Sequence, residues 1–183
     1  MGYFRSDGIS KDGNTYKLKE NKEAYYYQPI SEQSRKIDGD YTLSQSPDRR
    51  FWNKMDFDSR KKSNVKKQTS VVEITENNGL LNIEITIDGP KNVEVTIEMC
   101  FNKGGILTGA EPIGNDNYIL KSGFGTYAIG RDTIAFGAGK NGHQHINKLE
   151  SEQYGYHQGS LRSNGIHVYI TGYTPFSHEM TIG

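Results

Sequence analysis

The chain of 183 residues is short of apolar residues and of cysteine. Hydrophobic residues make up 33% of it, and no run approaches the roughly 18 apolar residues that a membrane-spanning helix needs. A single cysteine, Cys100, excludes an internal disulfide, so cysteine content does not indicate a compartment. The opening residues, MGYFRSDGIS, lack the apolar core of a secretory signal peptide. These absences predict no membrane span and no signal peptide in this chain.

Amphipathic helical patterns are also missing, whereas residues typical of strands and tight turns are plentiful. The 21 glycines and 12 tyrosines, against 5 prolines, favour many short strands joined by tight turns. From Val71 onward apolar and polar residues alternate, most clearly in 81–88 and 93–101, so each stretch has one apolar and one polar face. About nine strands in residues 71–183 predict an all-β fold, an antiparallel β-sandwich of jelly-roll-like architecture.

Turn signals and parity add detail to this prediction. Asn78-Gly79 suits a type I′ hairpin turn, and Gly130-Arg131-Asp132 is a second hairpin connection. We expect stretches 81–88 and 93–101 to pair antiparallel with each other. Cys100 falls on the polar face of its stretch, which predicts partial exposure.

The N-terminal part differs from the rest in polarity and charge. Residues 1–38 are expected to form a polar, extended lead-in with short hairpins or a linker, and residues 39–183 the β-sandwich domain. The net charge of zero hides an asymmetry, since residues 1–67 carry 15 Lys+Arg and 10 Asp+Glu. Because acidic residues are interleaved and no stacking pattern is present, we expect no nucleic-acid partner; an anionic polysaccharide would also suit the basic cluster.

The stretch 136–159 concentrates the residues with the most chemical potential, including three of the five histidines. His143 and His145, two apart on a predicted strand over 143–149, would point the same way, and Glu150 could complete a metal set. This spacing matches the first half of the cupin metal motif, and the second half is absent. Zn, Mn or Fe at these residues is one hypothesis. The alternative, which we favour, has no cofactor, and the two histidines then lie on a solvated strand face or form hydrogen bonds with a loop.

Acid–base and ligand-binding candidates extend beyond these residues. Tyrosine and histidine are natural base and acid for β-elimination from a uronic acid, and arginine can stabilise the carboxylate. The catalytic candidates are therefore His143, His145, Tyr156, His157 and Arg162. Exposed aromatic and basic residues could instead bind sugar rings without catalysis, with Trp52, Arg60, Lys61, Tyr154, Tyr156 and Tyr173 as candidates. His167 lies within an apolar strand and is predicted to be structural.

Several short sequence segments in the C-terminal part also occur together in a known protein family. They are Ile97–Phe101, Gly104-Gly105, Tyr118–Lys121, Gly123, Gly125, Tyr127, Asp132, Ile134, Phe136-Gly137, Tyr169–Phe176 and His178, with Gly39–Ser44 as an earlier part. Over roughly residues 39–183 the chain resembles the C-terminal β-sandwich region of heparinase II/III-like bacterial polysaccharide-degrading proteins. The resemblance implies a sandwich beside a helical toroid that carries most of the lyase machinery and is absent from this chain. In such lyases the sandwich can contribute a histidine, and sometimes a structural zinc, to the interdomain cleft; no catalytic motif aligns with particular residues.

These observations predict a non-catalytic, accessory module of a bacterial polysaccharide-processing protein, which supports or lines a glycan-binding cleft. Its expected partners are a polysaccharide, with a uronate-containing one as a candidate, and the catalytic domain of the parent chain. The parent protein is expected in the periplasm or outside the cell. Two alternatives stay open: a cupin-like enzyme with the His-x-His…Glu site, and an interaction module without a small ligand.

Overall fold

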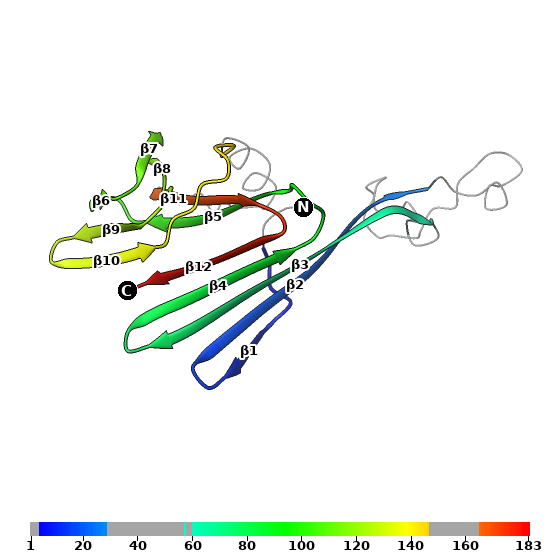
Figure 1. Cartoon of the computed structure of the whole chain (residues 1–183), viewed down its shortest axis with the longest axis horizontal. Helices are drawn as coiled ribbons and strands as arrows, with labels where there is room; N and C mark the ends of the chain where they lie inside the picture. Colours follow the sequence, from blue (N-terminus) through cyan, green and yellow to red (C-terminus); the bar gives the residue numbers. More distant parts are fainter. Residues whose placement is uncertain (1–3, 29–56, 58–59, 147–164) are drawn as a thin grey trace, which may run out of the picture. The chain divides into compact units, whose positions relative to one another are not determined.

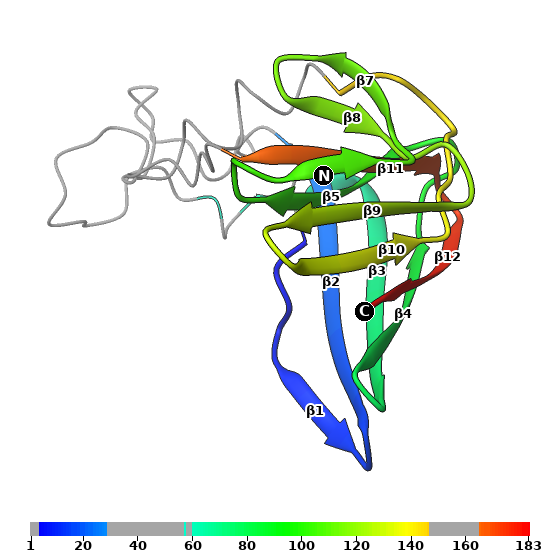
Figure 2. The ribbon, with the colours of Figure 1, turned by 90° about the vertical axis from the view of Figure 1, so that its left-hand side faces the viewer.

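The computed structural model describes residues 4–28, 57, 60–146 and 165–183 (Figures 1 and 2). Contacts divide the chain into two compact units, one of Met1–Lys22 with Gln68–Gly183 and one of Glu23–Lys67. The predicted boundary between residues 38 and 39 lies outside the described residues. In the described ranges no helix is present, and hence none long and apolar enough to cross a membrane.

The described residues form twelve strands. They are β1 (Ile9–Asp12), β2 (Thr15–Tyr27), β3 (Lys62–Asn77), β4 (Leu80–Asp88), β5 (Glu94–Phe101), β6 (Ile106–Thr108), β7 (Glu111–Gly114), β8 (Asn117–Ile119), β9 (Phe124–Ile129), β10 (Asp132–Gly137), β11 (Ile166–Tyr173) and β12 (Phe176–Ile182). The all-β prediction is confirmed.

The strands form two sheets (Figure 2). The larger has eight strands in the order β1-β2-β3-β4-β12-β10-β9-β6, and the smaller has four in the order β5-β11-β8-β7. β8 and β11 run parallel, and the other pairings with a defined register are antiparallel. Two sheets with a shared apolar core agree with the predicted β-sandwich, whereas the jelly-roll architecture stays a prediction.

Aromatic and branched side chains from both sheets build the shared core. Phe101 of the smaller sheet lies against Tyr127 and Phe136 of the larger one, with ring centroids 4.9 and 5.0 Å apart. Each fully buried side chain of this kind contributes about 1.5–3 kcal/mol before entropy is subtracted. The buried members of the main cluster are Leu120, Tyr127, Phe136, Val168, Ile170 and Met180.

Both predicted hairpins are present. Asn78 and Gly79 join β3 to β4 with φ of 51° and 85°, the left-handed backbone that an Asn-Gly turn supplies. The second hairpin joins β9 to β10, where Ile129 pairs with Asp132. Cys100 is exposed, as its parity predicts.

The predicted pairing of stretches 81–88 and 93–101 is wrong. β4 lies between β3 and β12 in the larger sheet, whereas β5 pairs with β11 in the smaller one. The connection between β4 and β5 crosses from one sheet to the other, where Val93 N–H donates to the Thr174 hydroxyl oxygen at 3.0 Å and Asn92 N–H to the Thr174 carbonyl at 2.9 Å. Crossing lets the apolar face of each strand cover the other sheet, so that neither face is left in water.

The N-terminal residues contribute strands to the larger sheet. β1 and β2 form a hairpin through Gly13, whose φ is 55°. The Thr15 and Thr75 hydroxyls are 2.9 Å apart, which ties β2 to β3. The β1–β2 hairpin is one of the short hairpins expected in the N-terminal segment.

One histidine in the core face of β12 makes the fold sensitive to pH. His178 is 8% exposed, and its Nε2–H donates to the Ala138 carbonyl at 2.8 Å. Burial lowers the pKa of His178, and the hydrogen bond to Ala138 opposes this effect without cancelling it. Nearby Lys140 also lowers this pKa, whereas Glu179 raises it.

Because the pKa is lower in the folded state, the unfolded chain binds the extra proton more readily. Neutral His178 makes its full contribution to the free energy of unfolding above about pH 6.5, the pKa of histidine in the unfolded chain. This contribution is lost as the pH falls through the lower pKa of His178 in the folded state. We expect His178→Gln, which can still donate to Ala138, to reduce the fall in the urea unfolding midpoint between about pH 8 and pH 5. An equal fall in wild type and variant would contradict this assignment.

Candidate functional site

Two of the predicted histidines lie in residues 140–146, which follow β10 and run beside the last residues of β11. Thr171 N–H donates to the Lys140 carbonyl, and Gly142 N–H to the Thr171 carbonyl, both at 2.9 Å. The Thr171 hydroxyl accepts from His143 N–H at 3.1 Å and donates to the His143 carbonyl at 2.7 Å. One buried threonine therefore satisfies both backbone groups of His143.

The predicted strand over 143–149 is wrong for the four residues that are described, 143–146. A side-chain hydroxyl takes the place of a strand partner there, so no ladder of backbone hydrogen bonds forms. The remaining residues of that stretch lie outside the described part of the chain.

His143 is a structural residue of this corner. It is 6% exposed, and its Nε2 lies 3.0 Å from the Val95 carbonyl. A carbonyl can only accept, so Nε2 carries the proton and Nδ1 is free to accept from His145 N–H at 3.3 Å. The imidazole thereby fastens residues 143–145 to the start of β5.

His145 is the exposed histidine of the pair. Its Nδ1 lies 2.7 Å from the Glu94 carboxylate, and its ring stacks on His143 with centroids 5.7 Å apart. The side chain of His145 is 59% exposed, which leaves the other ring nitrogen accessible to a ligand. Tyr173, 38% exposed, lies opposite Glu94 in the β5–β11 register, and its ring centroid is 5.2 Å from that of His143. We call Glu94, His145 and Tyr173 the β5–β11 corner.

Among the described residues, Glu94 is the carboxylate that contacts His145, whereas Glu150, to which the sequence pattern assigned this role, lies outside them. Sequence spacing alone pointed to a carboxylate after the histidines, whereas the contacting one comes 49 residues before His143. The available signal was indirect. The alternating pattern of β5 places Glu94 on the polar face of its strand. It does not reveal that β11 is the neighbouring strand, which brings Tyr173 opposite Glu94.

The donor set of this corner fits a metal ion poorly. Ligand atoms of Glu94, His143 and His145 all lie within 4.8 Å of one another. However, both ring nitrogens of His143 already have backbone hydrogen-bond partners, and a metal on Nδ1 would displace the bond from His145 N–H. Three donors match the ligand number of a catalytic zinc site and are one short of a structural site, so the poor fit rests on the hydrogen bonds that already engage His143. As it stands, the cluster is a hydrogen-bond network.

A second histidine–glutamate pair lies on the same face, between the same two strands. His167 Nδ1 is 2.6 Å from the Glu98 carboxylate, and the His167 ring stacks on Tyr169 with centroids 6.2 Å apart. Tyr169 donates to the Asn117 side-chain carbonyl at 3.1 Å. These contacts confirm that His167 is a satisfied structural residue.

The other predicted residues lie either in the second unit or outside the described part of the chain. Arg60 and Lys61 belong to the second unit, where the Arg60 guanidinium lies 5.3 Å from the Phe57 ring centroid and the Lys61 carbonyl accepts from Gln28 N–H at 2.8 Å. The candidates outside the described residues are Trp52, Glu150, Tyr154, Tyr156, His157 and Arg162.

In comparisons with models of protein families, with curated protein sequences and with solved structures, nothing matches this chain. The resemblance to heparinase II/III-like proteins and the function that it implies therefore stay predictions. What the corner can do follows from its own geometry.

The two histidines are expected to respond differently to removal. His143→Ala deletes a buried ring and leaves the Val95 carbonyl without its partner, so it should lower the free energy of unfolding by about 2–3 kcal/mol. His145→Ala removes one partner of an exposed hydrogen bond and should lower the free energy of unfolding by less than about 1 kcal/mol. Urea denaturation of both variants measures the difference.

Equal losses in the two variants would contradict the structural role of His143. Addition of zinc to the same samples tests the metal hypothesis, because a ligand that binds the folded state raises its stability. A zinc-dependent increase in wild type that disappears in both variants would overturn the hydrogen-bond interpretation.

Proposed function

We propose that the chain is a non-catalytic β-sandwich module that binds polysaccharide on behalf of a polysaccharide-processing parent protein. The observation that carries this proposal is the β5–β11 corner, where an exposed tyrosine lies beside an exposed histidine–glutamate pair. The tyrosine ring offers an apolar face for a sugar ring, and the imidazole and carboxylate offer a donor and acceptors for hydroxyl groups.

Rigidity of the corner supports a binding role. The β5–β11 register fixes the backbone positions of Tyr173 and Glu94, and the backbone of His145 donates to the buried His143 ring. Binding groups that are already in place lose less conformational entropy when a ligand arrives. A flexible arrangement of the same three side chains would bind more weakly.

Exposure of the corner argues against catalysis by this chain alone. General acid–base groups gain most from a site that excludes water, because electrostatic stabilisation of a transition state weakens in water. The His145 side chain is 59% exposed, and the ring nitrogens of His143 are engaged by the backbone. A catalytic domain elsewhere in the parent protein would supply the chemistry, and a polysaccharide substrate would place that protein in the periplasm or outside the cell.

The resemblance favours a uronate-containing polysaccharide as the partner. We expect the chain to bind polygalacturonate in affinity electrophoresis and Tyr173→Ala to weaken this binding about tenfold, which corresponds to the loss of about 1.4 kcal/mol. A matched control is Ile106→Ala, which shortens an exposed side chain on β6 of the other sheet and should have no effect.

Three outcomes would contradict the proposal. Binding that survives Tyr173→Ala unchanged would remove the corner from the site. Cleavage of polygalacturonate by the purified chain would show that it is an enzyme. Absence of binding to both polygalacturonate and a neutral glucan would favour an interaction module without a small ligand.

A further inference from the structure

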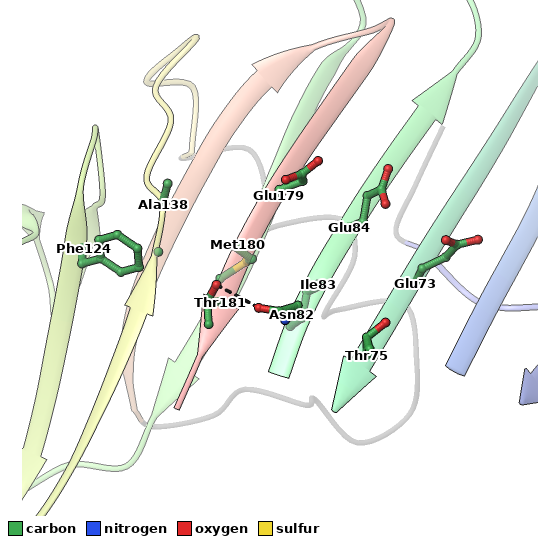
Figure 3. Close-up of a pocket in the computed structure, with 11 residues that line it drawn as sticks. Glu73, Thr75, Asn82, Ile83, Glu84, Phe124, Ala138, Glu179, Met180 and Thr181 are labelled. Atoms are coloured by element: carbon green, nitrogen blue, oxygen red, sulfur yellow. Dashed lines mark hydrogen bonds between the residues drawn. The ribbon is translucent and has the colours of Figure 1, made fainter. Parts of the chain in front are cut away.

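A groove of about 410 Å³ crosses the outer face of the eight-stranded sheet, on the side away from the core (Figure 3). Its floor comes from polar side chains that alternate with core residues along the strands. On β4, for example, Ile83 and Ile85 have core-face parity, whereas Asn82 and Glu84 have the opposite parity. Grooves of roughly 300–1,000 Å³ are large enough for small ligands.

Strand register organises the polar lining into two rows. Glu84 on β4 is opposite both Glu73 on β3 and Glu179 on β12. Two residues along, Asn82 is opposite both Thr75 and Thr181, and the Thr181 hydroxyl donates to the Asn82 side-chain carbonyl at 3.2 Å. Neighbouring strands are about 4.8 Å apart, so the rows present carboxylate and hydroxyl or amide groups at regular intervals across the groove.

The carboxylate row is only partly neutralised. At its outer end, the Lys17 ammonium of β2 contacts the Glu73 carboxylate. Among the described residues, neither Glu84 nor Glu179 has an ion-pair partner. Like charges directly opposite each other in a sheet are destabilising. The carboxylate row therefore lowers the stability of the folded state, and a bound cation would relieve the repulsion.

Beyond the carboxylates, an aromatic ring closes one end of the groove. Phe124 at the start of β9 is 60% exposed, and Gly137 and Ala138 line the groove beside it. Figure 3 shows the ring beyond the strands that carry the carboxylates. An exposed aromatic face next to hydroxyl and amide groups suits a ring that has one apolar face and several polar substituents.

We propose that this groove binds a glycan segment that carries free amino groups, such as linked glucosamine units. The ammonium groups would pair with Glu84 and Glu179, as Lys17 pairs with Glu73, and a sugar ring would lie on Phe124. The sheet face favours this ligand over a basic peptide strand, because β4, at the centre of the carboxylate row, is already paired with β3 along one edge and with β12 along the other. The groove lies on the opposite sheet from the β5–β11 corner, so this proposal does not depend on the function proposed above.

Calorimetric titration with two matched ligands tests the proposal. The first is a short glucosamine oligosaccharide, and the second is its fully N-acetylated counterpart, which has the same rings without the charge. At weakly acidic pH and low salt we expect the charged oligosaccharide to bind at least about tenfold more tightly, and added salt to weaken its binding.

Variants place the ligand in the groove. Glu84→Gln should weaken binding of the glucosamine oligosaccharide about tenfold, since it removes a charge-assisted contact. The same variant should raise the unfolding midpoint, because it relieves the repulsion along the row. Asp132→Asn, which removes an exposed carboxylate from the start of β10, is the control and should leave binding unchanged. Phe124→Ala should weaken binding of both oligosaccharides.

Equal affinity for the two oligosaccharides, or equal binding by wild type and Glu84→Gln, would overturn the proposal. So would the absence of binding to the glucosamine oligosaccharide. Tighter binding of a lysine oligopeptide at the same site would also overturn it and assign the groove to a basic protein segment. Tyr173→Ala lies outside the groove, so its effect on polygalacturonate separates failure of this proposal from failure of the function proposed above.

Discussion

Burial of one face of each sheet against the other is the constraint on which the rest of the structure depends. Phe101 reaches across from β5 to Tyr127 and Phe136, and this contact holds the smaller sheet against β9 and β10. A two-residue side-chain period then places the residues that alternate with the core residues on the outer face of each sheet. The corner and the groove are both consequences, since Glu94 and Glu84 are the outward neighbours of Val95 and Ile83 in their own strands.

The alternation along 81–88 and 93–101 was sufficient to predict strands with one buried face, and the Asn78-Gly79 turn was sufficient to predict a hairpin. The alternation could not predict which strands pair with each other, because it describes one strand at a time. The pairing of β4 with β12 joins residues about a hundred positions apart, such as Asn82 and Thr181. For the same reason the sequence identified His143 and His145 but missed Glu94, and no local pattern revealed that Glu73, Glu84 and Glu179 form one row.

The outer faces of the two sheets differ in whether their polar groups have partners. On the smaller sheet, His145 and His167 each lie within hydrogen-bonding distance of a glutamate, and Thr171 satisfies the backbone of His143. Such satisfied networks stabilise one arrangement of the chain. On the larger sheet, Glu84 and Glu179 face each other without a described counter-charge. The first arrangement holds its polar groups in place, whereas the second leaves carboxylates without a described counter-charge.

This difference limits what one ligand could do. A polyuronate would be repelled by the carboxylate row, and a polyamine sugar would gain little from a corner whose glutamate is already paired with His145. If both proposals hold, the module would bind two chemically distinct glycans on opposite sheets, or two differently charged parts of one heterogeneous polymer. Binding at two sites raises the overall affinity when a single chain can reach both. The rigid core between the sheets would then have a second role, because it fixes the separation that such a chain must span.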